Sequence, residues 1–181
     1  GPIRIAINQG INAPDTSSMG RLFDAAAALV GNIHGVTYEG EAAVWFEHQA
    51  DLAVMGSYQF DIRIENDILQ IDPGVILDQL RWDLGCLSVG AISAKFHRTV
   101  AAMVEEVCLR LREEVGAVQV ALAGGVFQNR LLLDLVWEGL EQKGFKVFLP
   151  EEVPINDGGI ALGQAWVGSL MIEKGIDNVF S

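Results

Sequence analysis

The chain has 181 residues, half of them apolar, and its 24 acidic residues against 12 basic ones leave a formal net charge of -12. This apolar content predicts a folded chain with a hydrophobic core rather than a disordered segment. The negative charge disfavours nucleic acid as a partner, and no apolar run approaches the roughly 20 residues of a membrane span. Cys86 and Cys108 lack the CxxC spacing of a metal or redox site, which favours a reduced, cytoplasmic setting.

The first two thirds of the sequence predict helices and one hairpin. An apolar stripe at helical spacing and a serine cap, Ser17 or Ser18, favour a first helix that Gly31 ends. Residues 58–72 alternate apolar and polar side chains around a turn at 65–67, which is typical of a half-exposed β-hairpin. Helices are expected over residues 16–31, 38–51, 73–84 and 88–116.

Two strand–helix units complete the chain. Residues 118–123 and 145–150 are short apolar runs, and helices are expected after them over 129–144 and 158–175. Uninterrupted apolar strands beside helices predict a parallel sheet that is covered on both faces. The expected fold class is therefore α/β, in one continuous domain, with the β-hairpin as an addition.

The first strand–helix connection, AGGVFQN, carries Gly124, Gly125 and Asn129. In an open parallel sheet, ligands bind beyond the carboxyl ends of the strands, where this connection lies. Glycines let the backbone approach a ligand closely, and free N–H groups at the start of a helix suit an anion. The alternative is a plain turn in which Asn129 caps the helix, and the spacing alone does not choose between the two.

The second connection, PEEVPINDGG, places Asp157 at the same predicted edge of the sheet. Its carboxylate is suited either to a metal ion or to capping the next helix, and the two glycines after it leave room for a ligand. His34, His48 and His97 show no metal-binding spacing, and His97 is expected on the surface or against a neighbouring helix. Neither cysteine has a base partner in the sequence, so no nucleophile is predicted.

Five stretches have distinctive sequences: NAPDTSSMGRLFDAAAALVG, TYEGEAAVWFE, AISAKFHRTVA, ALAGGVFQNRLLL and VPINDGGIALGQAW. In this order and spacing they resemble the HypF family of hydrogenase maturation carbamoyltransferases. The resemblance covers nearly the whole chain and is weakest in the hairpin. It implies a lobe of the sugar kinase, actin and Hsp70-like superfamily, with residues 1–181 as the second lobe of a carbamoyltransferase domain and the first lobe absent.

The resemblance implies an ATP-dependent transfer reaction. Carbamoyl phosphate and ATP would form a carbamoyl-adenylate, and the carbamoyl group would pass to the C-terminal cysteine of a HypE-type partner. The group would then become a cyanide ligand of nickel–iron hydrogenase. A thiolate supplied by the partner agrees with the lack of a predicted nucleophile, and the chain alone is expected to be inactive. Its task would be to position the adenylate, which acyl transfer requires.

The resemblance also implies roles for single residues. Asp24 and Gly40 match positions near the nucleotide ribose, whereas Glu41 stands where tRNA-modifying relatives have a second glycine. Asp157 matches a ligand of a divalent metal, iron or zinc with magnesium as an alternative, whose two histidine ligands lie outside this chain. The residues that match the loop in contact with the nucleotide are Gly124, Gly125 and Asn129.

Two other functions compete with this one. One is a lobe of a tRNA threonylcarbamoyltransferase. The NDGG motif and the acidic composition argue against this function. The other is a non-catalytic lobe that binds a nucleotide or a partner protein. A lobe separated from its neighbour would expose an apolar face, so self-association is expected.

Overall fold

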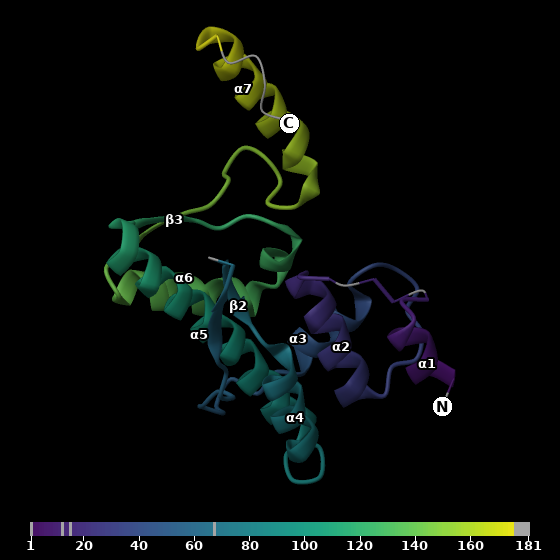
Figure 1. Cartoon of the computed structure of the whole chain (residues 1–181). Helices are drawn as coiled ribbons and strands as arrows, with labels where there is room; N and C mark the ends of the chain where they lie inside the picture. The colour runs from purple at the N-terminus through teal and green to yellow at the C-terminus, as the bar shows by residue number, and fades with distance from the viewer. Residues whose placement is uncertain (1, 12, 15, 67, 176–181) are drawn as a thin grey trace.

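The structure is a computed structural model that describes residues 2–11, 13–14, 16–66 and 68–175. Its helices are α1 (Pro2–Asn8), α2 (Met19–Gly31), α3 (Glu41–Gln49), α4 (Pro73–Asp83), α5 (Val89–Val115), α6 (Arg130–Gln142) and α7 (Ile160–Glu173), with the 3-10 turns η1 (Gly125–Gln128) and η2 (Asp157–Gly159). Its strands are β1 (Ile62–Glu65), β2 (Ile68–Ile71), β3 (Gln119–Ala121) and β4 (Lys146–Phe148). In Figure 1, α1 lies at one edge and α7 projects away from the other elements.

The strands form two separate two-stranded sheets. β3 and β4 run parallel, with Val120 opposite Val147, and α6 is the crossover between them. β1 and β2 run antiparallel, with Ile64 opposite Leu69. The α/β fold with a small parallel sheet is thus confirmed, and the predicted hairpin is present.

An aromatic cluster joins α2, α3 and α5 at the centre of the core. Phe23, Phe46 and Phe96 are each at most 1% exposed, and the Phe23 and Phe46 rings lie 5.0 and 5.6 Å from the Phe96 ring. Edge and tilted contacts of this kind suit the charge distribution of aromatic rings. α6 packs against α5 and buries Val136 and Leu140. This packing brings the start of α6 close to α2 and α3.

The prediction that helices cover both faces of the parallel sheet is wrong. Successive strand residues point to opposite faces, and Val120 and Val147 pack toward the core while Gln119 and Phe148 are exposed. The reason is that α7 projects away from the body of the molecule and has no buried residue (Figure 1). Among the described residues, one face of the sheet is therefore left without a covering helix.

Local details of the helices agree with the expected ones in part. α2 begins after the cap Ser18 and ends at Gly31, as predicted, but the left-handed residue after it is Asn32, whose φ of 51° asparagine tolerates. The 3-10 turn η1 separates β3 from α6, and α1 was not predicted from the sequence. In the described part of the chain, no helix combines the length and the apolarity needed to cross a membrane.

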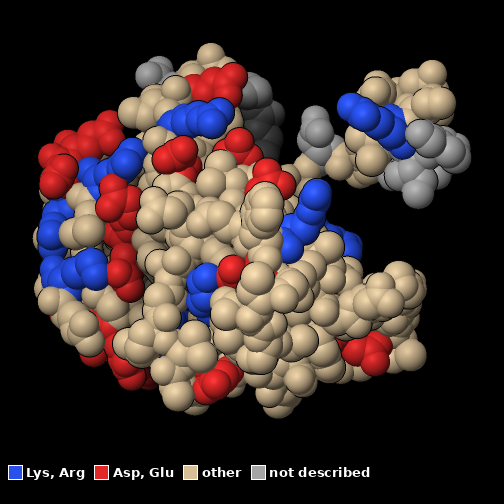
Figure 2. Space-filling view, turned by 90° about the horizontal axis from the view of Figure 1, so that it is seen from below, with Lys and Arg blue, Asp and Glu red and all other residues tan. Residues whose placement is uncertain are grey.

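The surface carries large apolar side chains as well as charges. Trp82, Met55 and Ile172 are 82%, 74% and 84% exposed. In Figure 2, charged side chains of both signs gather along one side of the face shown, and uncharged side chains cover much of the rest. Trp82 and Ile172 lie on different helices and Met55 lies in a loop, and single exposed apolar residues are common on protein surfaces.

Candidate functional site

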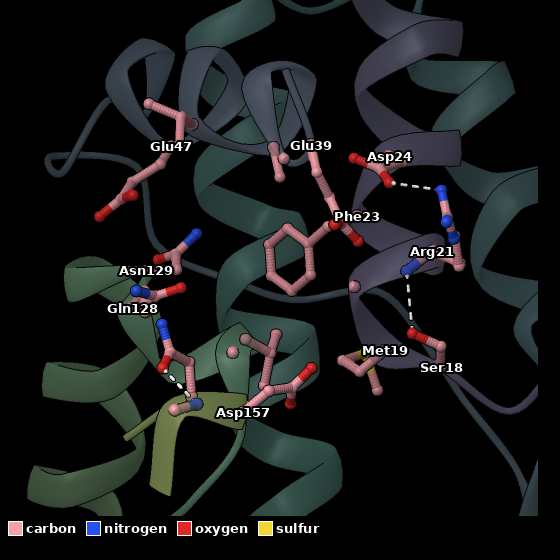
Figure 3. A pocket seen from close by; sticks show the side chains of 18 residues that line it. Ser18, Met19, Arg21, Phe23, Asp24, Glu39, Glu47, Gln128, Asn129 and Asp157 are labelled. Carbon is pink, nitrogen blue, oxygen red and sulfur yellow. Dashed lines mark hydrogen bonds and ion pairs between the residues drawn. The ribbon is translucent and has the colours of Figure 1, made fainter. Parts of the chain in front are cut away.

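A pocket of about 660 Å³ opens between α2, the start of α3 and the two strand–helix connections. Its volume lies within the roughly 300–1,000 Å³ of pockets that hold small molecules. Figure 3 shows polar side chains from these segments around a common space. The predicted site residues that line the pocket are Asp24, Gly40, Gly125, Asn129 and Asp157; Gly124 adjoins Gly125 in the chain.

The two strand–helix connections lie side by side because Gly124 joins them. Its N–H donates to the carbonyl oxygen of Ile155 at 2.7 Å. Gly124 has a φ of 106°, a left-handed conformation that favours glycine over residues with a Cβ atom. The sequence predicted that these connections would share a crevice, and the structure brings them together.

Two N–H groups at the start of α6, which the sequence predicted to be free for an anion, are already bonded. The Leu131 N–H donates to Glu47 Oε1 at 3.1 Å, and the Leu132 N–H donates to Asn129 Oδ1 at 2.8 Å. Both donors are therefore occupied by side chains of the same chain. Asn129 is the cap of α6, as the alternative interpretation proposed, and it also lines the pocket.

His97 lies behind Asn129 and is fully buried, so the prediction of a surface position is wrong and the helix-packing alternative is correct. Its Nδ1 is 2.8 Å from the Ser93 carbonyl oxygen, and its Nε2 is 2.9 Å from Asn129 Nδ2. Burial lowers the pKa of His97, while the hydrogen bond at Ser93 and the charge of Glu47 act in the opposite direction.

On the α2 and α3 side, Asp24 and Gly40 border the pocket. The half-buried Asp24 carboxylate lies 3.6 Å from Arg21 Nη1 in an ion pair. Gly40 has a φ of 82° and begins α3. Glu41 accepts hydrogen bonds from the backbone N–H and the hydroxyl of Thr37, which lower the pKa of its carboxyl group. Glu41 therefore closes the loop before α3.

Asp157 is exposed at the opposite side of the pocket and does not cap a helix. Asn156 Oδ1 accepts from the Gly158 N–H at 3.0 Å, and the cap position of α7 is Gly159, which has no side chain. The capping alternative for Asp157 is therefore wrong. Within the described residues, no three His, Cys, Asp or Glu side chains are grouped to hold a metal ion. One carboxylate does not fit a zinc site, which takes four ligands.

The pocket is acidic. Carboxylates of Asp24, Glu39, Glu47 and Asp157 line it, and Arg21 is the cation among its described lining residues (Figure 3). Arg21 is already paired with Asp24. The pocket therefore favours hydroxyl and amine groups of a ligand over unshielded phosphates.

Several residues of the site were missed from the sequence, and Glu47 and His97 matter most to its hydrogen bonds. Ala43 follows Gly40 at a spacing of three and Glu47 follows Ala43 at a spacing of four, so the helical period from Gly40 was the signal that could have found Glu47. His97 had no comparable signal, because 32 residues separate it from Asn129 and only the packing of α5 against α6 brings them together.

The chain is similar to proteins of known family. The family described as "Carbamoyltransferase, Kae1-like Domain, second subdomain" matches residues 2–164. "Carbamoyltransferase HypF" of Synechocystis sp. is 35% identical over 154 residues, which are 84% of this chain and 19% of that protein. A "probable bifunctional tRNA threonylcarbamoyladenosine biosynthesis protein" of Methanosarcina mazei is 34% identical over 88 residues, 49% of this chain and 16% of that protein.

Solved structures agree with the sequence relatives. A crystal structure of full-length HypF in its phosphate- and nucleotide-bound form superposes with a TM-score of 0.90 at 40% identity, over 95% of this chain and 23% of that one. The chain thus spans about a fifth of the length of the relatives it matches. Since the family match runs from residue 2 to residue 164 and the fold agrees with it, the chain belongs to the HypF carbamoyltransferase family.

Proposed function

We propose that the pocket binds the nucleoside part of an adenosine nucleotide, and that the chain is the second-lobe part of a HypF-type carbamoyltransferase domain. One observation carries the proposal. Side chains from α2, α3 and both strand–helix connections, which are distant in the sequence, line one pocket of about 660 Å³. The similar full-length HypF that superposes on this chain is itself described as nucleotide-bound, which supports the proposal.

The residues of the pocket suit a ribose and a base. The half-buried carboxylate of Asp24 is an acceptor for ribose hydroxyls, and its ion pair with Arg21 orients it. Gly40 and Gly125 carry no side chain, so a ligand approaches their backbone closely. Asn129 offers both a donor and an acceptor, as base or ribose recognition requires.

The phosphates of ATP fit this part of the pocket less well than the nucleoside does. Four carboxylates line it, and Arg21 is committed to one of them. We therefore propose that groups outside this chain bind the phosphates and any divalent ion. Asp157 alone does not hold such an ion, so its role in the proposal is limited to one carboxylate at the rim of the pocket.

In the whole protein, the proposed reaction is the ATP-dependent transfer of a carbamoyl group from carbamoyl phosphate, through carbamoyl-adenylate, to the C-terminal cysteine of a HypE-type partner. This chain's residues would bind and orient the adenosine end, away from water. The fold would be a lobe of the sugar kinase, actin and Hsp70-like superfamily, and the setting cytoplasmic. The family membership and the carbamoyltransferase names of the relatives support this proposal.

Titration calorimetry with ATP and AMP tests the nucleotide site. We expect the chain to bind both, and Asp24→Asn to weaken binding by about tenfold or more, because a charge-assisted hydrogen bond is lost. Glu114→Gln, an exposed acidic position on α5, is the matched control and should leave binding unchanged. Equal affinity of the wild-type and Asp24→Asn chains would rule out the assigned ribose contact.

The similarity to a tRNA threonylcarbamoyladenosine protein makes a tRNA-modifying lobe the second candidate. The net charge of -12 opposes it, since nucleic acid binding depends on neutralising phosphates. An electrophoretic shift assay with unmodified tRNA at low salt separates the two. We expect no shift, and a shift that weakens steeply with salt would favour the tRNA function. Nucleotide binding without any transfer activity in the full-length protein would favour a non-catalytic lobe.

A further inference from the structure

We infer that His97 is a positioning residue of the pocket, which orients the Asn129 amide through a hydrogen bond from Asn129 Nδ2 to His97 Nε2. The inference deepens the proposed function and rests on it, because Asn129 is the residue expected to contact the nucleotide. His97 does not line the pocket itself. It would act on the ligand only through Asn129.

The surroundings of His97 hold its ring in place. It is fully buried on α5, and its ring centroid lies 5.1 Å from that of Phe23 on α2 and 5.7 Å from that of Phe46 on α3. The buried Ser93 hydroxyl, one turn earlier on α5, donates to the Phe46 carbonyl oxygen at 2.5 Å. Because three helices fix the ring, His97 is a rigid support for the loop that it contacts.

The hydrogen bonds determine the protonation state of the pair. The Leu132 N–H is a donor, so the Asn129 atom 2.8 Å from it is the acceptor Oδ1, and the amide nitrogen Nδ2 must face His97. His97 Nε2 therefore accepts and carries no proton. His97 Nδ1 lies 2.8 Å from the Ser93 carbonyl oxygen, which only accepts, so the proton is on Nδ1. A neutral imidazole with this tautomer satisfies both contacts.

The arrangement fixes both ends of the Asn129 amide. Oδ1 is tied to the first turn of α6 and Nδ2 to His97. One N–H of Nδ2 and one lone pair of Oδ1 remain, and Asn129 lines the pocket beside Gln128 (Figure 3). A ligand would therefore meet an amide that is already oriented, which reduces the entropy lost on binding.

Protonation of His97 would break this arrangement, because an Nε2–H and an Nδ2–H would then face each other. The groups that face His97 are Phe23 of α2, Phe46 of α3, Asn129, and Ser93 and Phe96 of its own helix; the ionisable group near enough to affect its charge is Glu47 of α3. Burial lowers the pKa of His97 more than Glu47 raises it, so the imidazole is neutral at pH 7.

Two substitutions test the inference. His97→Met fills the space and offers only the weakly accepting thioether sulfur, whereas His97→Gln supplies an amide that accepts from Asn129 and donates to Ser93. We expect His97→Met to weaken ATP binding roughly tenfold, as loss of one buried hydrogen bond would, and His97→Gln to restore most of it. In an Asn129→Ala background, His97→Met should cause no further loss, because its effect passes through Asn129.

His48→Met is the matched control. His48 on α3 makes the same type of contact, from Nδ1 to the Val44 carbonyl oxygen at 2.8 Å, but it is exposed and lies outside the pocket. We expect it to bind ATP as the wild type does. An equal loss of affinity in both variants would show a general effect on stability and would overturn the inference.

Nitrogen-15 NMR gives a readout that needs no ligand, and its first part uses the wild-type chain alone. We expect His97 to be protonated on Nδ1 and unprotonated on Nε2 at pH 7, and the Asn129 side-chain amide signal to move in His97→Gln. A proton on Nε2 would overturn the inference. If the NMR result holds but Asn129→Ala binds ATP normally, then the proposed nucleotide role of Asn129 has failed, and the positioning role falls with it.

Discussion

α6 and α7 are helices of 13 and 14 residues that each follow a strand of the same parallel sheet, yet they are buried very differently. α6 has an apolar stripe and buries Leu132, Leu133, Val136 and Leu140. α7 is apolar on all sides and has no buried residue. A helix that is apolar all round is typical of one with partners on several sides, and the described residues do not supply them.

The two helices also begin differently, and this affects the pocket. Asn129 and Glu47 accept hydrogen bonds from the first turn of α6, whereas Gly159 at the start of α7 has no side chain to do so. The Asn129 side of the pocket is therefore tied to the core through α3 and α5. The Asp157 side precedes a helix without buried contacts. This chain therefore supplies one side of the pocket that packed helices hold in place, and a second side that leads into a helix with no buried residue.

The largest expected difference is in core packing. Leu140→Ala should lower the free energy of unfolding by about 2–5 kcal/mol, because it leaves a cavity between α6 and α5. Leu162→Ala on α7, where the side chain is 58% exposed, should change it by less than about 0.5 kcal/mol. Urea unfolding followed by circular dichroism measures both. Comparable losses would show that α7 is packed in solution.

The next effect concerns the start of α6. Asn129→Ala should lower the free energy of unfolding by about 1–2 kcal/mol, since the cap is lost and His97 Nε2 is left buried without a donor. Asn156→Ala, which removes the corresponding side-chain acceptor before α7, should have a smaller effect because its contact is exposed. Thermal unfolding of the two variants at one pH compares them, and equal losses would contradict the difference between the two helix starts.

A smaller effect is expected from pH. Burial holds the pKa of folded His97 below its ordinary value of 6.5, so the unfolded chain binds more protons in the window below pH 6.5. Stability should therefore decrease as pH falls below about 6.5, and this part of the decrease should disappear in His97→Gln. His48→Gln is the control. Urea midpoints measured between pH 5 and 8 test the prediction, and identical slopes in all three chains would refute it.

The smallest effect on the free energy of unfolding is expected from substitutions on α7. Trp166→Lys and Ile172→Lys alter side chains that are 66% and 84% exposed, so the free energy of unfolding should stay within about 0.5 kcal/mol. We expect both to reduce concentration-dependent self-association in sedimentation velocity, because they charge an apolar surface. Ile64→Lys, 71% exposed on β1, is the control for exposed apolar residues elsewhere. Association that continues unchanged would place the contact outside α7.

Local patterns in the sequence predicted most of the elements and part of the site. The hairpin, the parallel strands and the helices follow from periods of two and about 3.6 residues, which depend on neighbours along the chain. The positive φ of Gly124 and the helix cap at Asn129 also follow from local sequence, because each involves the backbone within a few residues. The helix start expected to be free for an anion is partly occupied, because Glu47 accepts from one of its donors from 84 positions away.

The sequence by itself determined the fold class, the family and five of the residues that line the pocket, Asp24, Gly40, Gly125, Asn129 and Asp157. The tertiary structure alone decided how they are joined: Gly124 to Ile155, Glu47 to the start of α6, and His97 to Asn129. It also decided that no other described residue covers one face of the sheet or buries a residue of α7. The physical reason is range, since backbone preferences act over three or four residues, whereas the partner of a buried donor or of an apolar face is set by which distant segments pack against it.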